Sequence, residues 1–428
     1  MNRTHFALLL TPWLATACAS STNPTPDAPP SASPVVTTSQ RTTTPAAAAS
    51  PTTAGDPAAR ATNDFGFDLY GQLAAKPDEN LAYSPTSIAI ALSMTVAGAR
   101  GQTEQQMHEV LHFPSEAMRL HAAWGATMER WAGLPDVEIR VANRLFGQTG
   151  SPFEDEFLAL NAERYAAPFL PVDFAGAPEA QRVLINDWVA ERTRKRIVDL
   201  IPPGGIDAST NLVLANALYL KSRWASPFDP HHTELAPFTT STGAREQVSM
   251  MKQVSEIPQA VFDDAIVARL DHRGGAFATT FVMPREGHSL AALEKSISAA
   301  ALSRWTAALT PKRVLLELPA VKIEPGDAVR LQKPLSALGM PLAFSGAADF
   351  SGIAPRGLFI DEVYHKAFVA MNEEGTEAAA ATAVVMAESG VPSLPDAPAL
   401  AFDRPFLFFI QDAKTGLVLF AGRMTQPS

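Results

Sequence analysis

The run that most constrains the fold is LVLANALYLK (Leu212–Lys221), which is apolar at almost every position. A strand with one face in water alternates apolar and polar residues, whereas an unbroken apolar run suits a strand covered on both faces. This run therefore predicts a strand in the middle of a sheet. Its one polar interruption is Asn216, and a buried amide of this kind needs hydrogen-bond partners.

Other segments extend this pattern across the chain. FATTFVMP, VLLELPAVKI, FLFFIQD and LVLFAGRM are rich in β-branched and aromatic residues, which predicts further strands. SPTSIAIALSMTVAGARG (84–101) has apolar residues at helical spacing and an early proline, which predicts a buried helix. Many strands with several helices, and no regular βαβ alternation, indicate the α+β class.

The N-terminus, MNRTHFALLLTPWLATAC, has the features of an export signal too short to span a membrane. Ala15-Thr16-Ala17 is a signal-peptidase site, but the next residue, Cys18, is the only cysteine. Bacterial lipoprotein signals resemble this arrangement, with cleavage before a cysteine that then carries lipid. We expect residues 1–17 to be removed and Cys18 to anchor the protein to the cell envelope, at the outer membrane or cell surface. The alternative is a periplasmic or secreted protein.

The following stretch, residues 18–63, is rich in Ser, Thr, Pro and Ala and has too few large apolar residues to form a core. We expect it to be a disordered tether, followed by a single folded domain over residues 64–428. The net charge of −10 and the lack of a basic patch argue against nucleic-acid binding. One basic cluster, ERTRKR (Glu191–Arg196), is best explained as the solvated face of a helix.

One catalytic motif is present, HEVLH (His108–His112), which satisfies the H-E-x-x-H pattern of zinc proteases. Ser115 and Met118 occupy the places where the extended motif requires glycine and histidine. Phe113-Pro114 also ends the helix immediately. We therefore expect the histidines to be structural, and we expect no metal, cofactor or catalytic residue, so the chain is not predicted to be an enzyme.

A second unusual segment, EEGTEAAAATAVVMAESG, begins at Glu373. Alanine favours helix, but the β-branched residues Thr382, Val384 and Val385 favour strand, so propensity does not decide between them. As a strand, Thr376 and the even-numbered residues to Met386 would share one face. Side chains this small could enter between strands that are already packed.

The surrounding residues resemble the serpin family over the whole folded region. VYHKAFVAMNEEGTEAAAAT (363–382) resembles the serpin hinge and LAFDRPFLFFI (400–410) the C-terminal signature strand. NALYLKSRWASPFDP (216–230), INDWVAERT (185–193) and LGMPLAFSGAADFSGI (338–353) are similar to other serpin segments in the same order. This resemblance implies a serpin fold: one domain with a large central sheet, smaller sheets, several helices and an exposed reactive-centre loop at about 373–401.

The resemblance also implies a mechanism and a set of site residues. A target serine protease, or alternatively a cysteine protease, would cleave the loop and be held as a covalent complex by a monomeric inhibitor, while the loop enters the central sheet. Three groups of residues match serpin positions. They are the hinge (Glu373, Gly375, Thr376, Ala378, Ala379, Ala380 and Ala381), a polar group where the sheet opens (Ser84, Ser87, Asn216 and His365), and Trp224 at the top of the opening.

Family spacing places the reactive bond at Ser389-Gly390, with Met386, Glu388 and Leu394 as alternative cleavage points. No Lys or Arg lies between Glu373 and Ala401, so elastase-, subtilisin- or chymotrypsin-like targets are expected in place of trypsin-like ones. We expect an inhibitor, because the insertable run lacks proline. A non-inhibitory serpin that binds a ligand or has a structural role is the alternative, and a zinc protease is a remote third interpretation.

Overall fold

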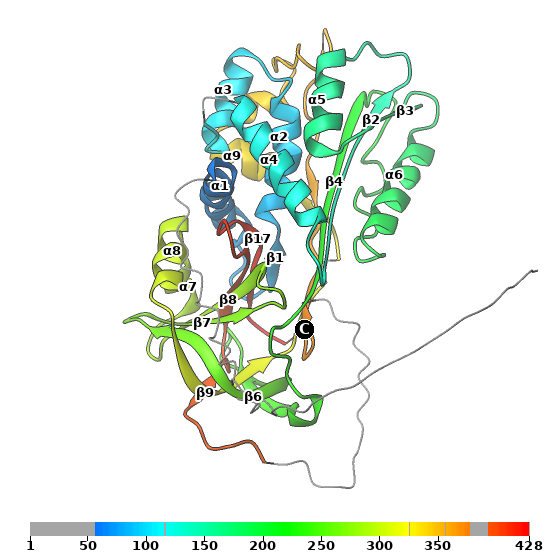
Figure 1. Cartoon of the computed structure of the whole chain (residues 1–428). Helices are drawn as coiled ribbons and strands as arrows, with labels where there is room; N and C mark the ends of the chain where they lie inside the picture. The colour runs from blue at the N-terminus through cyan, green and yellow to red at the C-terminus, as the bar shows by residue number, and fades with distance from the viewer. Residues whose placement is uncertain (1–55, 115–116, 325, 356, 377–392, 428) are drawn as a thin grey trace, which may run out of the picture. The chain divides into compact units, whose positions relative to one another are not determined.

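The structure is a computed structural model that describes residues 56–114, 117–324, 326–355, 357–376 and 393–427 (Figure 1). The export signal, Cys18 and most of the expected tether lie outside these ranges, so those expectations stay predictions. Helix α1 (Pro57–Leu73) begins earlier than the expected domain start at residue 64. Asp56 caps it by accepting hydrogen bonds from two backbone N–H groups, and the first alanines are buried, so the boundary is corrected to residue 56.

The predicted central strand is β4 (Leu212–Arg223), which pairs antiparallel with β2 (Val137–Gln148) from Leu212 to Ser222. Both belong to a six-stranded sheet with the strand order β10-β13-β14-β4-β2-β3 among the described residues. The remaining strands of this sheet are β3 (Phe169–Val172), β10 (Val321–Ile323), β13 (Val369–Met371) and β14 (Gly375–Thr376). The expectation that the apolar run lies inside a sheet is confirmed.

A second sheet has nine strands among the described residues, in the order β1-β17-β16-β8-β7-β6-β9-β15, with β5 paired to β6. A two-stranded ribbon joins β11 (Val329–Arg330) to β12 (Tyr364–His365). The nine strands are β1 (Leu81–Tyr83), β5 (Glu234–Thr239), β6 (Arg245–Val261), β7 (Ala265–Asp271), β8 (Phe277–Pro284), β9 (Thr310–Pro319), β15 (Ala399–Ala401), β16 (Phe406–Asp412) and β17 (Val418–Met424).

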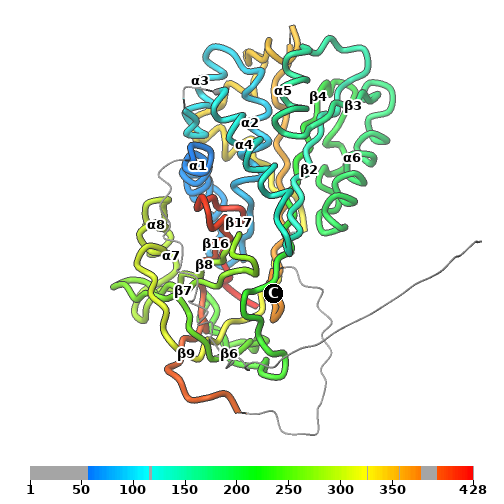
Figure 2. The backbone as a smooth tube through the Cα atoms, in the orientation of Figure 1, coloured from blue at the N-terminus to red at the C-terminus, as the bar shows by residue number. Residues whose placement is uncertain are grey.

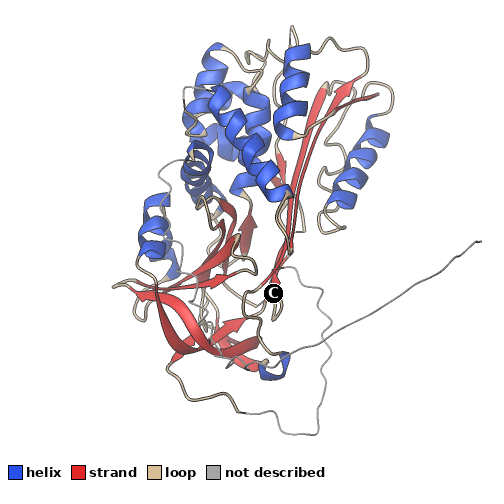
Figure 3. Ribbon diagram, in the orientation of Figure 1, coloured by secondary structure: helices blue, strands red, loops and turns tan. Residues whose placement is uncertain are grey.

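Helices lie on both faces of the six-stranded sheet (Figure 3). Helix α2 packs against one face of β4, with α4 and α5 nearby, and α6 covers the opposite face (Figure 1). The helices after α1 are α2 (Pro85–Val96), α3 (Gly101–Val110), α4 (Ala117–Ala132), α5 (Asp155–Tyr165), α6 (Pro178–Arg192), α7 (Leu290–Glu294), α8 (Ala299–Ala307) and α9 (Gln332–Leu338), with short 3-10 turns η1 (Pro230–His232) and η2 (Pro341–Phe344).

The core follows this layering. One large apolar cluster fills the space between α2, the inner face of β4 and the nine-stranded sheet, and a smaller one lies between α6 and the outer face of β4. Helix α6 ends at Arg192, so the basic cluster runs beyond it into a turn in which Arg194 and Lys195 have positive φ. The expectation of a helical basic face is therefore wrong for that half of the cluster.

A buried ion pair connects the second sheet to two helices. Arg423 of β17 is 1% exposed, and its guanidinium lies 2.6 Å from the carboxylate of Glu294 at the end of α7. The Tyr70 hydroxyl of α1 donates a hydrogen bond to the same carboxylate at 2.5 Å. The Arg423 Nε also donates to the Glu79 carbonyl oxygen. These contacts tie α1, α7 and β17 together.

Replacing Glu294 with Gln should lower the free energy of unfolding by about 3 kcal/mol, because it leaves the buried Arg423 charge without an opposite charge beside it. Urea unfolding at neutral pH measures this change. The double variant E294M/R423M should lose less stability than E294Q, because it removes both charges. A loss below about 1 kcal/mol for E294Q would show that water already screens this pair.

Candidate functional site

The candidate site is a gap in the six-stranded sheet. Strands β13 and β4 are connected only by the two residues of β14, with Thr376 paired to Met371 on one side and to Ser222 on the other. From Leu212 to Lys221, the edge of β4 that faces β13 has no strand beside it in the described part of the chain. We call the gap between this edge and residues 357–368 the slot, because residues of both sides line one pocket. Figure 2 shows the backbone of β4 and β2, with the orange trace that leads to β13 running alongside.

The hinge residues already occupy one end of the slot. Gly375 and Thr376 are buried within the sheet, with Thr376 4% exposed, although both were expected in the exposed loop of about 373–401. The turn before them is fixed by Asn372, whose side-chain oxygen accepts hydrogen bonds from the backbone N–H groups of Glu374 and Gly375. Glu373 accepts a hydrogen bond from the Thr233 hydroxyl at 2.7 Å.

Glycine is required at position 375 by close backbone contact. Its φ is +155°, and an added Cβ would lie 2.2 Å from the carbonyl oxygen of Ser222. Any larger side chain would push β14 away from β4. The glycine therefore allows the hinge to enter the sheet.

Trp224 closes the same end of the slot, as its resemblance to the serpin tryptophan implied. Its backbone N–H donates to the Glu374 carbonyl oxygen at 2.9 Å, and its indole Nε1 donates to the Asn372 carbonyl oxygen at 2.8 Å. The ring is 1% exposed and stacks edge-on against His272 at 4.8 Å. These contacts hold the turn that leads into β14.

The expected polar group lies halfway along the slot. The Ser87 hydroxyl donates to the side-chain oxygen of Asn216, and the Ser84 backbone N–H donates to His365 Nε2 at 3.0 Å. The hydroxyl of Ser84 caps α2 by accepting from the Ser87 N–H. The structure therefore brings the four residues together as two pairs, connected through the first turn of α2.

Sequence reasoning missed a fifth member of this group, Asn143 of β2. Its side-chain oxygen accepts a hydrogen bond from the Asn216 Nδ2 at 2.6 Å, and its own amide donates to the Tyr165 carbonyl oxygen. Asn143 and Asn216 are direct cross-strand partners. Asn216 stands out in the sequence because the rest of its run is apolar, whereas Asn143 is one of several polar residues in β2, and the register that pairs the two depends on the fold.

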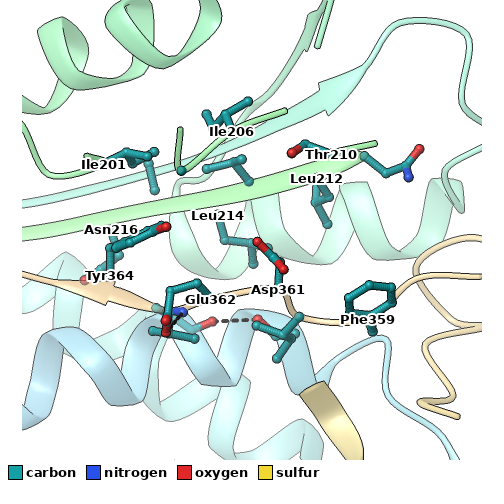
Figure 4. A pocket seen from close by; sticks show the side chains of 18 of the residues that line it. Ile201, Ile206, Thr210, Leu212, Leu214, Asn216, Phe359, Asp361, Glu362 and Tyr364 are labelled. Atoms are coloured by element: carbon teal, nitrogen blue, oxygen red, sulfur yellow. Dashed lines mark hydrogen bonds between the residues drawn. The ribbon is translucent and has the colours of Figure 1, made fainter. Parts of the chain in front are cut away.

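Beyond the polar group, the slot widens into a cavity of about 190 Å³. Leu212 and Leu214 of β4 form one wall, and Tyr364 with the 357–363 segment forms the other (Figure 4). Side chains of α2, including Ile88 and Leu92, form the floor. The cavity is lined by both apolar and polar side chains, with Asp361 and Glu362 along one wall (Figure 4).

The HEVLH histidines do not form a metal site. Helix α3 ends at Val110, and His112 lies beyond it with a φ of +53°, its Nε2 2.7 Å from a carboxylate oxygen of Asp68. His108 instead packs edge-on against Phe113. Within the described ranges no group of three metal-ligating side chains occurs.

Several expected site residues lie outside the described residues. They are Cys18, Ala378, Ala379, Ala380, Ala381, Met386, Glu388, Ser389 and Gly390. Leu394, one alternative cleavage point, is described and half-buried, a few residues before β15. No helix in the part of the chain with described coordinates is long and apolar enough to cross a membrane.

Comparison with known proteins identifies the family. The family model "Serpin (serine protease inhibitor)" matches residues 60–427. The chain belongs to the serpin family. It is 36% identical to human serpin B3 over 86% of this chain and 99% of the relative, and 37% identical to the bovine leukocyte elastase inhibitor over 86% and 98%.

Solved serpin structures show the same fold. Human thyroxine-binding globulin superposes with a TM-score of 0.77 at 28% identity, covering 87% of this chain and 99% of the globulin. Uncleaved ovalbumin superposes with a TM-score of 0.76 at 28% identity, covering 87% of this chain and all of ovalbumin. The α+β serpin fold predicted from the sequence is confirmed.

Acid should destabilise this serpin through buried neutral histidines. Burial lowers the pKa of His365 and of His121 to about 4 and that of His272 to about 3. The unfolded chain takes up these protons below pH ~6.5, but the folded chain does not, so stability falls as the pH drops below that value. Between pH 6 and pH 5 we expect a loss of about 3 to 4 kcal/mol in the free energy of unfolding, measured by urea titration.

The control for this effect is a single variant. H272Q removes one of the three titrating groups, so its loss over the same pH interval should be about one-third smaller than that of the parent protein. The comparison uses only the change in the free energy of unfolding with pH in each protein, so any destabilisation that H272Q causes equally at every pH cancels. An equal slope in both proteins would mean that His272 is not responsible for the acid sensitivity.

Proposed function

We propose that this serpin inhibits serine-type endopeptidases as a suicide substrate. The target protease cleaves the loop and forms an acyl-enzyme, and the freed segment enters the slot as a new strand between β4 and β13. The observation that carries the proposal is the slot itself. It has an open strand edge along one side, and the hinge has already entered its end in register.

The register of β14 predicts where each loop residue would go. Because Thr376 lies opposite Ser222, each further residue along the loop would pair with the residue one place earlier on β4. Thr382 would then lie opposite Asn216. Counting from the Thr376–Met371 pair places the same Thr382 opposite His365. Its hydroxyl would therefore enter the polar group, where hydrogen-bond partners are available.

The size of the loop side chains follows the shape of the slot. Directly opposed residues in a sheet lie on the same face, so Ala380 would face inward beside Leu218, within the packed core. Val384 would face inward beside Leu214, at the cavity, and Met386 beside Leu212. Small residues would thus enter where the slot is tight, and larger ones where the cavity provides room.

Insertion would supply enough free energy to move a protease. Fourteen residues, 376 to 389, lie between Gly375 and the expected reactive bond, and at about 3.3 Å per residue the new strand would be nearly 50 Å long. A dozen new hydrogen bonds at roughly 1 kcal/mol each give a driving force on the order of 10 kcal/mol. Such a force could drag the acylated protease along the sheet and distort its active site before the acyl bond hydrolyses.

The register also bears on the reactive bond and the target. The open edge of β4 ends at Leu212, opposite Met386, so cleavage at Ser389-Gly390 would leave the whole run free to insert. The absence of Lys and Arg between Glu373 and Ala401 supports elastase-, subtilisin- or chymotrypsin-like targets. Similarity to the leukocyte elastase inhibitor agrees with that class. From its N-terminal residues alone, we also propose export and lipid attachment at Cys18.

Adduct formation tests the proposed function. The full chain is incubated with elastase-, subtilisin- and chymotrypsin-type proteases and then analysed by denaturing gel and mass spectrometry. We expect an SDS-stable adduct with at least one of them, and the mass of the released C-terminal peptide fixes the reactive bond. Loop cleavage by all three classes without an adduct would instead indicate a non-inhibitory, ligand-binding serpin.

Replacing Ala380 with Arg should convert the inhibitor into a substrate. The register places this side chain inward beside Leu218, where a charge would lose its hydration without a partner. We expect cleavage at the normal rate and at least a tenfold smaller adduct yield. The matched control is E377R, whose side chain would face outward opposite Lys221. E377R should retain adduct formation, and an undiminished adduct with A380R would contradict the insertion register.

A further inference from the structure

Two arginines lie beside one tryptophan between α6 and β2. Helix α6 packs against both β4 and β2 (Figure 1). The guanidinium of Arg144, from β2, lies over the ring of Trp188, from α6, with its Cζ 5.3 Å from the ring centroid. Arg192, the last residue of α6 and part of the basic cluster ERTRKR, lies over the same side chain with its Cζ 5.8 Å from the ring centroid. Two positive charges therefore converge on one indole.

These two charges have no acidic partner. Among the described residues, neither Arg144 nor Arg192 forms an ion pair with a carboxylate. Asp187 and Glu191, the acidic residues that flank Trp188 and Arg192 on α6, both have exposed side chains. A cation–π contact attracts a guanidinium to the ring, but it does not neutralise the charge. Two like charges this close repel each other, and an anion bound between them would remove that repulsion.

Two N–H groups at the same point lack acceptors. The Arg144 Nε and the Trp188 Nε1 are both shielded from solvent and form no hydrogen bond with any described residue. Buried donors without acceptors are rare in proteins, and a bound water or ion commonly supplies the acceptor. Arg144 and Trp188 are half-buried and Arg192 is exposed, so side-chain rotation alone would give a small ion access to both donors.

Neighbouring arginines of this basic surface already have partners. Arg140 and Arg194 contact the carboxylate of Glu138 at 2.6 Å and 2.8 Å. Arg196 contacts the ring of Phe368 on the other side of the slot. Arg140 and Arg194 are therefore neutralised by an acid, whereas Arg144 and Arg192 are not.

We propose that Arg144, Trp188 and Arg192 form a binding site for a phosphate or sulfate group. Each guanidinium presents forked N–H donors that match two oxygens of such a group, and the indole Nε1–H would donate to a further oxygen. The bound group would join β2 to α6. Free phosphate and the phosphate of a lipid headgroup share this chemistry, and the experiment distinguishes the two sources. The inference is independent of the proposed function, because it does not involve the slot or the loop.

Calorimetric titration of the full chain with inorganic phosphate tests the site. We expect saturable binding of one phosphate, and a thermal unfolding midpoint that rises with phosphate concentration, because only the folded chain holds the site. R144M and R192M keep the apolar stem of each side chain and remove its charge. Each should weaken binding at least tenfold, because each removes charge-assisted hydrogen bonds. W188F keeps an aromatic ring but removes the indole N–H, so it should weaken binding about threefold or more.

The matched control is R140M. Arg140 lies on the same face of β2 as Arg144, but it is already paired with Glu138, so R140M should bind phosphate as the parent protein does. A loss in R140M equal to that in R144M would overturn the site, because general positive charge would then explain the binding. Competition by chloride as strong as that by sulfate would overturn it for the same reason. If R144M folds poorly, R192M decides, because Arg192 is exposed at the end of α6.

A second arm identifies the source of the phosphate group. Vesicles of phosphatidylcholine are compared with vesicles that also contain phosphatidic acid, whose headgroup is a phosphate monoester. Binding that requires phosphatidic acid and is lost in R144M and R192M supports a lipid headgroup as the ligand. Phosphate binding without vesicle binding supports a free anion. A parent protein that shows no saturable phosphate binding, or unchanged affinity in R144M, R192M and W188F, overturns the proposal.

Discussion

The rest of the structure depends on a strand that is paired along only one side. Strand β4 pairs with β2 from Leu212 to Ser222, but on its other edge only Ser222 and Arg223 have strand partners among the described residues. Unpaired backbone groups next to an apolar core are costly, so the edge has an open capacity for hydrogen bonds. These unpaired groups give the hinge and the polar group their roles, because each lies at a different level of the same edge.

Each level controls a different property of the slot. At the entrance, Gly375 and Trp224 hold the first residues of the loop in register. Halfway along, Asn216 and His365 line the opening from opposite sides, and no strand of the described residues lies between them. At the far end the cavity beside Leu214 provides space for larger side chains. The sequence of the loop follows the same order: Gly375 comes first, the small residues 378–381 follow, and Thr382 precedes the larger Val384 and Met386.

Some of this could be predicted from sequence because it follows from local pattern. The apolar run of β4, the need of Asn216 for partners, and the end of the HEVLH helix at Phe113-Pro114 all depend on neighbouring residues. The remaining features depend on register and tertiary contact. Asn143 joins the polar group only because β2 pairs with β4 in one register. Thr376 is buried because β14 pairs with β4 in the register that sets Thr376 opposite Ser222.

The turn that follows α6, at Arg194 and Lys195, could not be predicted for a related reason. The sequence ERTRKR does not predict positive φ at Arg194 and Lys195, because Arg and Lys have high helix propensity and normally continue a helix. The turn forms because contacts to β2, to α6 and across the slot outweigh a local preference. Strained backbone conformations are common in the switch regions of proteins. Here the strained turn lies close to the proposed path of the loop.

Hydrogen exchange of β4 before and after cleavage of the loop is the most direct test of this account. In the intact protein, the backbone N–H groups between Leu212 and Lys221 that point into the slot should exchange quickly. After cleavage they should become protected, while the N–H groups that point toward β2 change little, and the thermal unfolding midpoint should rise. Equal exchange at the slot edge in both states would contradict strand insertion as the basis of function.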